Sequence, residues 1–305
     1  MRRSRTRALG ALLLALCAPA SAHAQVALEQ FTPAPLARDG FGFGGAGILD
    51  EGAYALFAAT DYAHDPLVYK LTRGPRRQAA VAHHLVLHVG AAIGIHPRVM
   101  LRFDLPVHAL MRGDRPLVLP RTAPDGAGLG DLLIGARVRL AGGPTSRLTV
   151  VTELLARLPT AELTQEGQRY AGDEFGSYEA ALLGEARWSP VALRLRLGAR
   201  FRAAADVQNL ELGQMLVFAA GARANLASWV SLHVELSGAT HLANTFERHH
   251  TPFELLLGAK LHHARGWFGA AAGPGLVYGY GAPDARVVVS GGAELGGPGR
   301  RASAE

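Results

Sequence analysis

Four arginines share one face of a short stretch of this chain. In the sequence VALRLRLGARFR (191–202), Arg194, Arg196, Arg200 and Arg202 alternate with apolar residues, namely Val191, Leu193, Leu195, Leu197 and Phe201. A period of two puts the arginines on one face of a β-strand, whereas a helix would spread them around its circumference. Guanidinium groups in a row can pair with carboxylates of neighbouring strands or attract anions. One strand cannot neutralise four arginines, so we expect acidic neighbours or water on this face.

The same alternation recurs along most of the chain, with the charged residues of each stretch on one face. These residues are predicted to line a common interior, as pore-lining side chains: Arg102, Asp104, Arg137, Arg139, Glu153, Arg157, Glu179, Glu185, Arg187, Arg194, Arg196, Arg200, Arg202, Arg223, Glu235, Glu254 and Lys260. Asp131 and Glu294 fall on the same face. The set can pair across strands and fill a narrow interior, or it can line a water-filled pore. Because the basic residues outnumber the acidic ones, such a pore is expected to prefer anions.

Catalytic and metal-binding patterns are weak. Ser231 and His233 form a Ser/His pair on one strand face, but the chain has no GxSxG elbow. The pairs His83-His84 and His262-His263 alternate across a strand, so adjacent histidines point to opposite faces and chelate poorly. We therefore predict no catalytic residue, no metal site and no cofactor. A membrane-embedded lipid-modifying enzyme that uses Ser231 and His233 is kept as an alternative.

The first 24 residues read as a secretory signal peptide. A basic start (MRRSRTR) precedes the apolar run ALGALLLALCAPA, and the small residues of Ala22-His23-Ala24 provide a cleavage site. Cleavage after Ala24 would remove Cys17, the only cysteine, and lower the formal net charge from +6 to +2, because four arginines leave with the leader. The high isoelectric point is then no argument for nucleic-acid binding.

The rest of the chain predicts strands. No other stretch offers the roughly 18 apolar residues of a transmembrane helix, yet 49% of the residues are hydrophobic and 37 are glycine. Residues 25–52 are rich in Pro and Gly and are expected to precede a barrel and to plug it or lie against it. Twelve alternating stretches follow, joined by short and long connections in turn, over 53–63, 81–95, 99–109, 130–141, 147–158, 177–188, 191–202, 213–225, 229–240, 252–263, 267–278 and 284–295.

Alternating short and long connections are typical of outer-membrane barrels, and an even strand number returns both ends to one side. We predict an all-β, antiparallel, up-and-down transmembrane β-barrel of about 12 strands over residues 53–295, with a tail at 296–305. Trp188, Trp229 and Trp267 lie beside short turns and are expected to form an aromatic girdle. An exported β-sandwich binding protein is a second alternative, but it would leave a large apolar surface in water.

Four motifs resemble a known family. LEQFTPAP (from Leu28), DYAHDPLV (from Asp61), GLGDLLIGARVRL (from Gly128) and ARLPTA (from Ala156) resemble the N-terminal barrel of OmpA-type outer-membrane proteins of myxobacteria and their relatives. The chain is also similar to twelve-stranded barrels of small-molecule transporters, over most of residues 28–295. The family often continues into a peptidoglycan-binding domain, which we do not expect after Leu295. The usual terminal aromatic residue is also missing, since Leu295 is followed by Gly296.

These observations predict an outer-membrane protein of a Gram-negative cell, exported through a cleaved signal peptide. Its function is expected to be a narrow passive pore for small, preferentially anionic solutes, or a structural barrel. Its partners are expected to be outer-membrane lipid and small solutes, with no nucleic acid. The sequence leaves open whether residues 25–52 close the lumen and what the oligomeric state is.

Overall fold

The computed structural model describes residues 27–69, 78–114, 125–164, 170–207 and 210–296. The predicted signal peptide and the tail beyond Gly296 lie outside the described residues. In the described part, no helix is long and apolar enough to cross a membrane.

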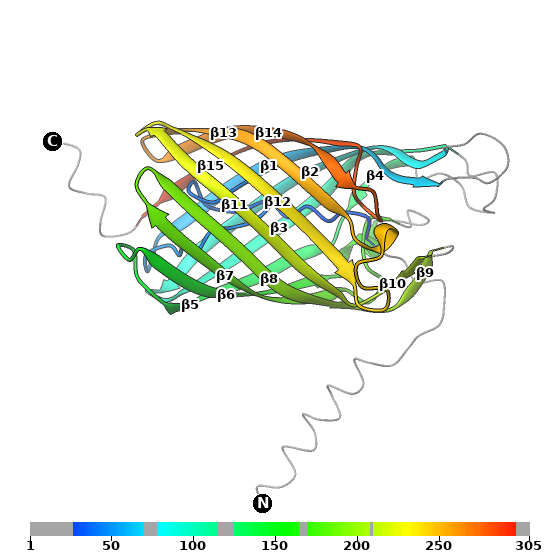
Figure 1. Cartoon of the computed structure of the whole chain (residues 1–305), viewed down its shortest axis with the longest axis horizontal. Helices are drawn as coiled ribbons and strands as arrows, with labels where there is room; N and C mark the ends of the chain where they lie inside the picture. Colours follow the sequence, from blue (N-terminus) through cyan, green and yellow to red (C-terminus); the bar gives the residue numbers. More distant parts are fainter. Residues whose placement is uncertain (1–26, 70–77, 115–124, 165–169, 208–209, 297–305) are drawn as a thin grey trace, which may run out of the picture.

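One antiparallel sheet closes into a barrel (Figure 1). Its strands are β1 (Tyr54–Tyr69), β2 (Gln78–His96), β3 (Val99–Arg112), β4 (Asp125–Leu129), β5 (Leu132–Ala141), β6 (Leu148–Leu158), β7 (Ser177–Trp188), β8 (Val191–Arg202), β11 (Met215–Ala227), β12 (Val230–His241), β13 (Phe253–His263), β14 (Gly266–Val277) and β15 (Ala285–Leu295). Strands β4 and β5 both pair with β3 and together form one wall strand. The wall therefore has twelve strands, and the pairing of β1 with β15 closes it.

The connections differ in length at the two ends of the barrel. Five short turns join strands at one end, here called the turn end, and the long connections gather at the other, here called the loop end. The loop-end connections carry a two-stranded sheet, β9 (Ala205–Val207) and β10 (Leu210–Leu212), and two single-turn 3₁₀ helices, η1 (Thr160–Leu163) and η2 (Arg248–His250). The predicted all-β, up-and-down barrel is confirmed. The β-sandwich alternative is wrong, because one closed sheet replaces two packed sheets.

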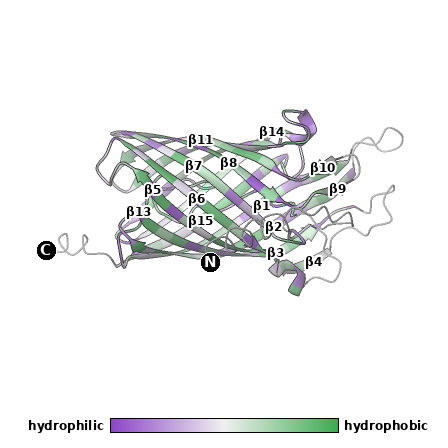
Figure 2. Cartoon of the chain, turned by 90° about the horizontal axis from the view of Figure 1, so that it is seen from below, coloured by the Kyte–Doolittle hydropathy of each residue, from purple (hydrophilic) through white to green (hydrophobic). Residues whose placement is uncertain are grey.

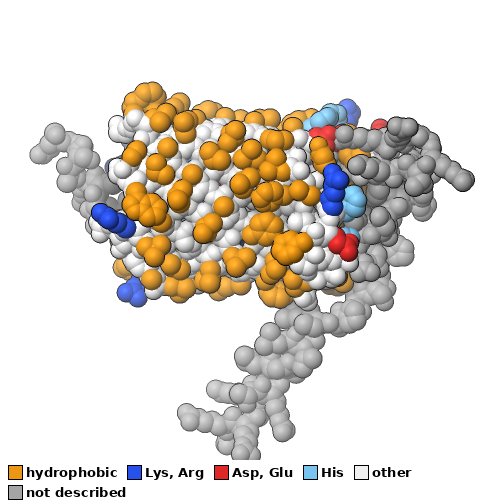
Figure 3. Space-filling view, viewed as in Figure 1, with side chains coloured by type: hydrophobic (Ala, Val, Ile, Leu, Met, Phe, Trp, Pro, Cys, Tyr) orange, Lys and Arg blue, Asp and Glu red, His pale blue; other side chains and the backbone are white. Residues whose placement is uncertain are grey.

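The outer face of the strands is apolar, and the inner face of most of them carries charged or polar side chains; β14, with Trp267 and Ala271 inward, is an exception. In β8, Leu195 is 66% exposed while the neighbouring Arg194 is 3% exposed. The alternation shows as green and purple along the strands in Figure 2. In Figure 3, hydrophobic side chains cover the visible wall and charged ones gather at its two ends. Such an uncharged belt is the surface that a transmembrane barrel presents to lipid.

Strands β1 to β3 reach farther toward the loop end than the sequence pattern predicts. The Asp65-Pro66 pair suggests a strand end, because proline lacks an N–H donor. These residues instead form a bulge in β1, where Asp65 takes a positive φ of 53°. Pairing with β2 resumes at Leu67. The local sequence therefore predicts a strand end at a position where the strand continues past a β-bulge.

The aromatic girdle is only partly as predicted. Trp188 and Trp229 are more than half exposed beside turn-end turns. Trp267 is 5% exposed and lies on the inner face, while the next residue, Phe268, faces outward. The prediction for Trp267 is wrong. Successive residues of a strand point to opposite faces, and in β14 the outward position belongs to Phe268 and the inward one to Trp267.

Candidate functional site: the charged lumen

Residues 27–53, here called the lumen segment, cross the interior of the barrel. The segment starts at the loop end, where the Leu28 N–H donates to the Tyr170 carbonyl at 2.9 Å. It ends at the turn end, where the Gly52 N–H donates to the Gly94 carbonyl at 2.8 Å. Its blue trace is visible behind the strands in Figure 1. The interior is therefore occupied along its length.

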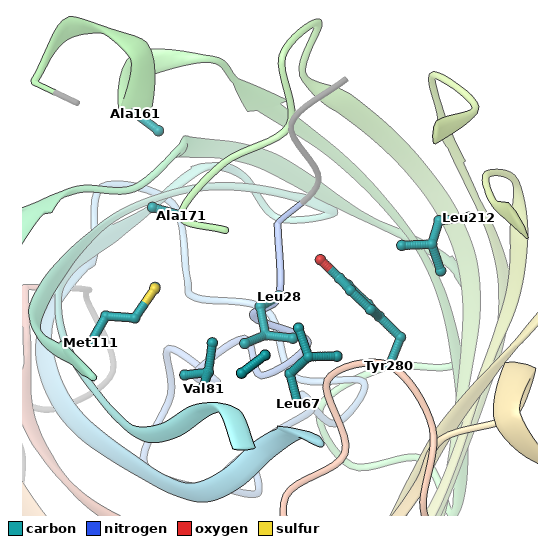
Figure 4. Packing of buried hydrophobic residues seen from close by; sticks show 9 residues of the cluster. Leu28, Leu67, Val81, Met111, Ala161, Ala171, Leu212 and Tyr280 are labelled. Carbon is teal, nitrogen blue, oxygen red and sulfur yellow. The ribbon is translucent and has the colours of Figure 1, made fainter. Parts of the chain in front are cut away.

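An apolar cluster holds the segment at the loop end (Figure 4). Leu28 packs there with residues from several strands and connections, namely Leu67, Ala80, Val81, Met111, Ala161, Ala171, Leu212 and Tyr280. A second cluster at the turn end packs Leu36 and Leu49 against Ala55, Ala92 and Met100. Burial of apolar surface thus fixes both ends of the segment.

The glycine-rich part of the segment binds the wall through its backbone. Glu235 accepts the N–H groups of Phe41 and Gly42 at 2.5 and 2.8 Å. The approach is close, since a Cβ at Gly40 would lie 1.7 Å from the nearest Glu235 oxygen. Lys260 donates to the carbonyl oxygens of Asp39 and Gly40 at 3.0 and 2.8 Å. Glycine is needed here because a side chain would occupy the place of the wall group.

The four arginines of β8 all have acidic partners. Arg194 lies 3.2 Å from Glu185, and Arg200 lies 2.8 Å from Glu179. Arg196 bridges Glu179 and Glu153, the latter at 3.0 Å, and Arg202 lies 3.6 Å from Asp173. The acids come from β6, β7 and a loop-end connection, so the row of arginines is neutralised by its neighbours.

One carboxylate of this wall serves three guanidinium groups. Glu179 accepts from Arg200 and Arg196, and Arg157 lies 3.4 Å from it. We call these four residues the arginine cluster. Glu179 is therefore shared by three guanidinium groups, one of which, Arg196, also pairs with Glu153.

The opposite arrangement occurs around Arg286. Its guanidinium bonds Glu254 through Nε at 2.8 Å and Nη2 at 3.2 Å, contacts Glu29 at 3.3 Å, and bonds Asp61. We call these four residues the carboxylate cluster. Three carboxylates surround one guanidinium, so this side of the lumen carries an excess of negative charge.

A cavity of about 80 Å³ lies between the two clusters. Glu179, Arg196 and Arg200 line it on one side and Glu254 on the other. The lumen segment contributes Gln30, Phe31, Thr32, Gly42 and Phe43, and the wall between the clusters contributes Val217, Phe218, Ala219, Ser237, Gly238, Ala239, Pro252 and Leu256.

The predicted pore-lining residues all lie in the described part of the chain, and each is buried or half-buried. Most join one network with the lumen segment; for example, Arg102 donates to the Pro33 carbonyl at 2.7 Å, and Arg223 to the Arg38 carbonyl at 3.1 Å. Arg139 and Arg187 donate to turn-end carbonyls, those of Pro97 and Pro144, and Arg187 also lies 2.7 Å from Glu185.

Sequence reasoning missed Asp61, Arg286 and the segment's acids Glu29 and Asp39. Arg286 has the same strand parity as Glu294, which was placed inward, so the alternation in β15 could have found it. Asp61 likewise shares its parity with the buried Ala55 and Phe57 of β1. Nothing in the local sequence indicates which wall group an acid of the segment meets.

Ser231, His233 and His84 lie inside the barrel, whereas His83 and His263 are exposed. Ser231 Oγ is 2.9 Å from His233 Nε2 and 3.0 Å from His262 Nε2. His84 bonds His108 at 2.7 Å. Within the described ranges, no three histidine, cysteine, aspartate or glutamate side chains are grouped so that they could hold a metal ion.

No family model and no curated protein matches this chain. The resemblance to OmpA-type barrels therefore stays a prediction.

Solved structures do match. An outer-membrane channel from Pseudomonas putida F1 aligns with a TM-score of 0.61 at 13% identity, over 81% of this chain and 97% of that chain. The NanC porin aligns with a TM-score of 0.51 at 7% identity, over 79% of this chain and 100% of that chain. At these identities the similarity shows the fold, which is that of outer-membrane β-barrels. The fold and the apolar belt together place the protein in the outer membrane.

Proposed function

We propose that the protein is an outer-membrane channel for small polar solutes, closed by the lumen segment in the present structure and open when that segment moves. The observation that carries the proposal is a twelve-stranded wall lined with charged side chains around a segment that is not part of the wall. A barrel with a purely structural role could fill its interior with apolar side chains, which cost less to bury than charges.

The contacts of the segment support opening. Between its two ends, the segment is held by hydrogen bonds and ion pairs, such as Arg137 to Asp39 at 3.3 Å and Arg157 to Thr32 at 3.1 Å. Two small apolar clusters, one around Phe31 and Phe41 and one around Ala46, add to these contacts. Water can replace the polar partners once the lumen is wet, because net hydrogen-bond contributions in water are modest. The segment can therefore detach without disturbing the pairing of the wall strands.

The open channel is expected to prefer anions. The segment supplies Glu29 and Asp39, which pair with Arg286 and Arg137 in the closed state. Displacing the segment removes these two carboxylates and leaves a wall on which basic side chains outnumber acidic ones. A basic lining raises the local concentration of anions. Reversal potentials in a salt gradient measure this preference, and a cation preference of the open state would contradict it.

Conductance across a planar bilayer tests the channel itself. Wild-type protein is expected to be mostly closed, and a variant that lacks residues 27–49 is expected to conduct steadily. Asp39→Asn and Glu235→Gln keep the chain length but weaken the binding of the glycine-rich part, so they should open more often than wild type. Arg98→Gln, which removes an exposed charge at the turn end, is the matched control. A deletion variant that folds but does not conduct would refute the proposal.

We further propose that the protein is not a lipid hydrolase. Ser231 and His233 are 1% and 2% exposed and lie on the lumen face, so neither can reach an ester bond in the surrounding bilayer. Lipid hydrolysis by wild type and His233→Ala should be equal and at background. Activity that is lost in His233→Ala would support the enzyme alternative.

A further inference from the structure

We propose that the cavity between the two charge clusters binds a small zwitterionic solute, with its anionic group at the arginine cluster and its cationic group at the carboxylate cluster. This inference rests on the proposed channel function and names the class of solute that the channel binds while the lumen segment is in place.

The basic end of the cavity has hydrogen-bond donors to offer. Arg200 is 7% exposed and lines the cavity. It donates through Nε to Glu179 at 2.8 Å and through Nη1 to Gln30 at 3.1 Å. A guanidinium carries five N–H groups, so donors remain for a carboxylate. Two guanidinium groups, those of Arg196 and Arg200, line this end of the cavity with one carboxylate, Glu179, so an added negative charge is favoured here.

The acidic end of the cavity favours a cation. Glu254 lines the cavity, and both its oxygens accept from Arg286. Each carboxylate oxygen can accept a further hydrogen bond. Arg286 is shared with Asp61 and Glu29, so one guanidinium does not neutralise the group. An ammonium near Glu254 would reduce the imbalance.

The body of the solute must be small and partly apolar. Between the charged ends, the cavity is lined by Val217, Ala219, Ala239, Leu256 and the rings of Phe31 and Phe43. A cavity of about 80 Å³ has room for on the order of five water molecules or a similar number of solute atoms. This is the size of the smallest amino acids, such as glycine and alanine.

The two ends together decide between zwitterions and simple ions. An anion alone would have to sit near Glu254, and a cation alone near Arg196 and Arg200. Each would meet a like charge in a space where water screens poorly. Only a solute with both charges satisfies both ends.

Equilibrium binding of radiolabelled glycine to the full chain in detergent tests this proposal. Saturable binding is expected, with acetate and methylammonium competing at least tenfold more weakly than unlabelled glycine. Arg200→Gln and Glu254→Gln should each weaken glycine binding at least tenfold, and Arg98→Gln should leave it unchanged. Ala239→Val, which narrows the cavity and keeps every charge, should also weaken binding and guards against misfolding of the charge variants.

Two outcomes would overturn the proposal. One is an absence of saturable glycine binding to folded wild-type protein, and the other is acetate competing as well as glycine, which would make the site a plain anion site. The assay needs no ion flow, so glycine binding by a protein that never conducts would refute the channel and leave the site standing. Conduction without glycine binding would support the channel and refute the zwitterion site.

Discussion

Lys260 is a fully buried cation that the surrounding residues hold without a direct carboxylate partner at hydrogen-bond distance in the described structure. Two backbone carbonyls of the lumen segment accept from it, and its ammonium lies 4.1 Å from the ring centroid of Trp267 and 5.0 Å from that of Phe41. Cation–π contacts of this kind gain strength away from water. The inward position of Trp267 therefore serves the binding of the segment rather than the membrane surface.

Glycine at position 44 is predicted to be essential for the close approach of the segment to the wall. A Cβ at Gly44 would lie 2.0 Å from Arg137 Nη2, which is held by Asp39 and Glu153. Gly44→Ala is expected to destabilise the folded protein by about 1–3 kcal/mol, because the buried pair must shift. Gly184→Ala is the control, since a Cβ there meets nothing within 4 Å. Denaturant unfolding in detergent measures both, and equal stabilities would contradict the account.

At the scale of elements, the period of two was enough to predict the strands and their faces. Charged residues on one face and leucines on the other define β8 without any tertiary information. The pattern could not predict the Asp65 bulge, which depends on pairing with β2. Nor could it predict how the charges divide into a basic and an acidic cluster, because this depends on which strands are neighbours and on where the segment places Glu29.

The outer face of β8 predicts a depth-dependent cost for an added charge. Leu195 lies in the middle of the strand, and Leu140 lies one residue from the turn-end limit of β5; both are more than half exposed. Leu195→Arg is expected to cost about 2–4 kcal/mol and Leu140→Arg about 0–1 kcal/mol, since the penalty falls toward the membrane interface. Reversible folding into lipid vesicles measures both. Equal penalties would argue that this face does not meet the bilayer core.

For the whole molecule, the wall and the lumen segment are expected to contribute separately to stability. Deleting residues 27–49 leaves the backbone pairing of the strands intact but removes partners from inward charges such as Arg137 and Arg286. The deletion variant should still show heat-modifiable gel migration, with the transition roughly 10 °C lower than in wild type. A variant that cannot form a heat-modifiable species would show that the barrel wall does not fold without the lumen segment.

The last strand of the chain holds the segment that comes first. In β15, Arg286 binds Glu29 and Glu294 accepts the Ala37 N–H at 2.8 Å, and each contact joins residues 257 positions apart. The same strand closes the barrel against β1. Until β15 is in place, the segment lacks these partners, and after the seam closes it is enclosed by the wall and by the apolar cluster at the loop end. We therefore expect the barrel to close around its own N-terminal segment, so that the pairing of β15 with β1 completes both the wall and the filling of the lumen.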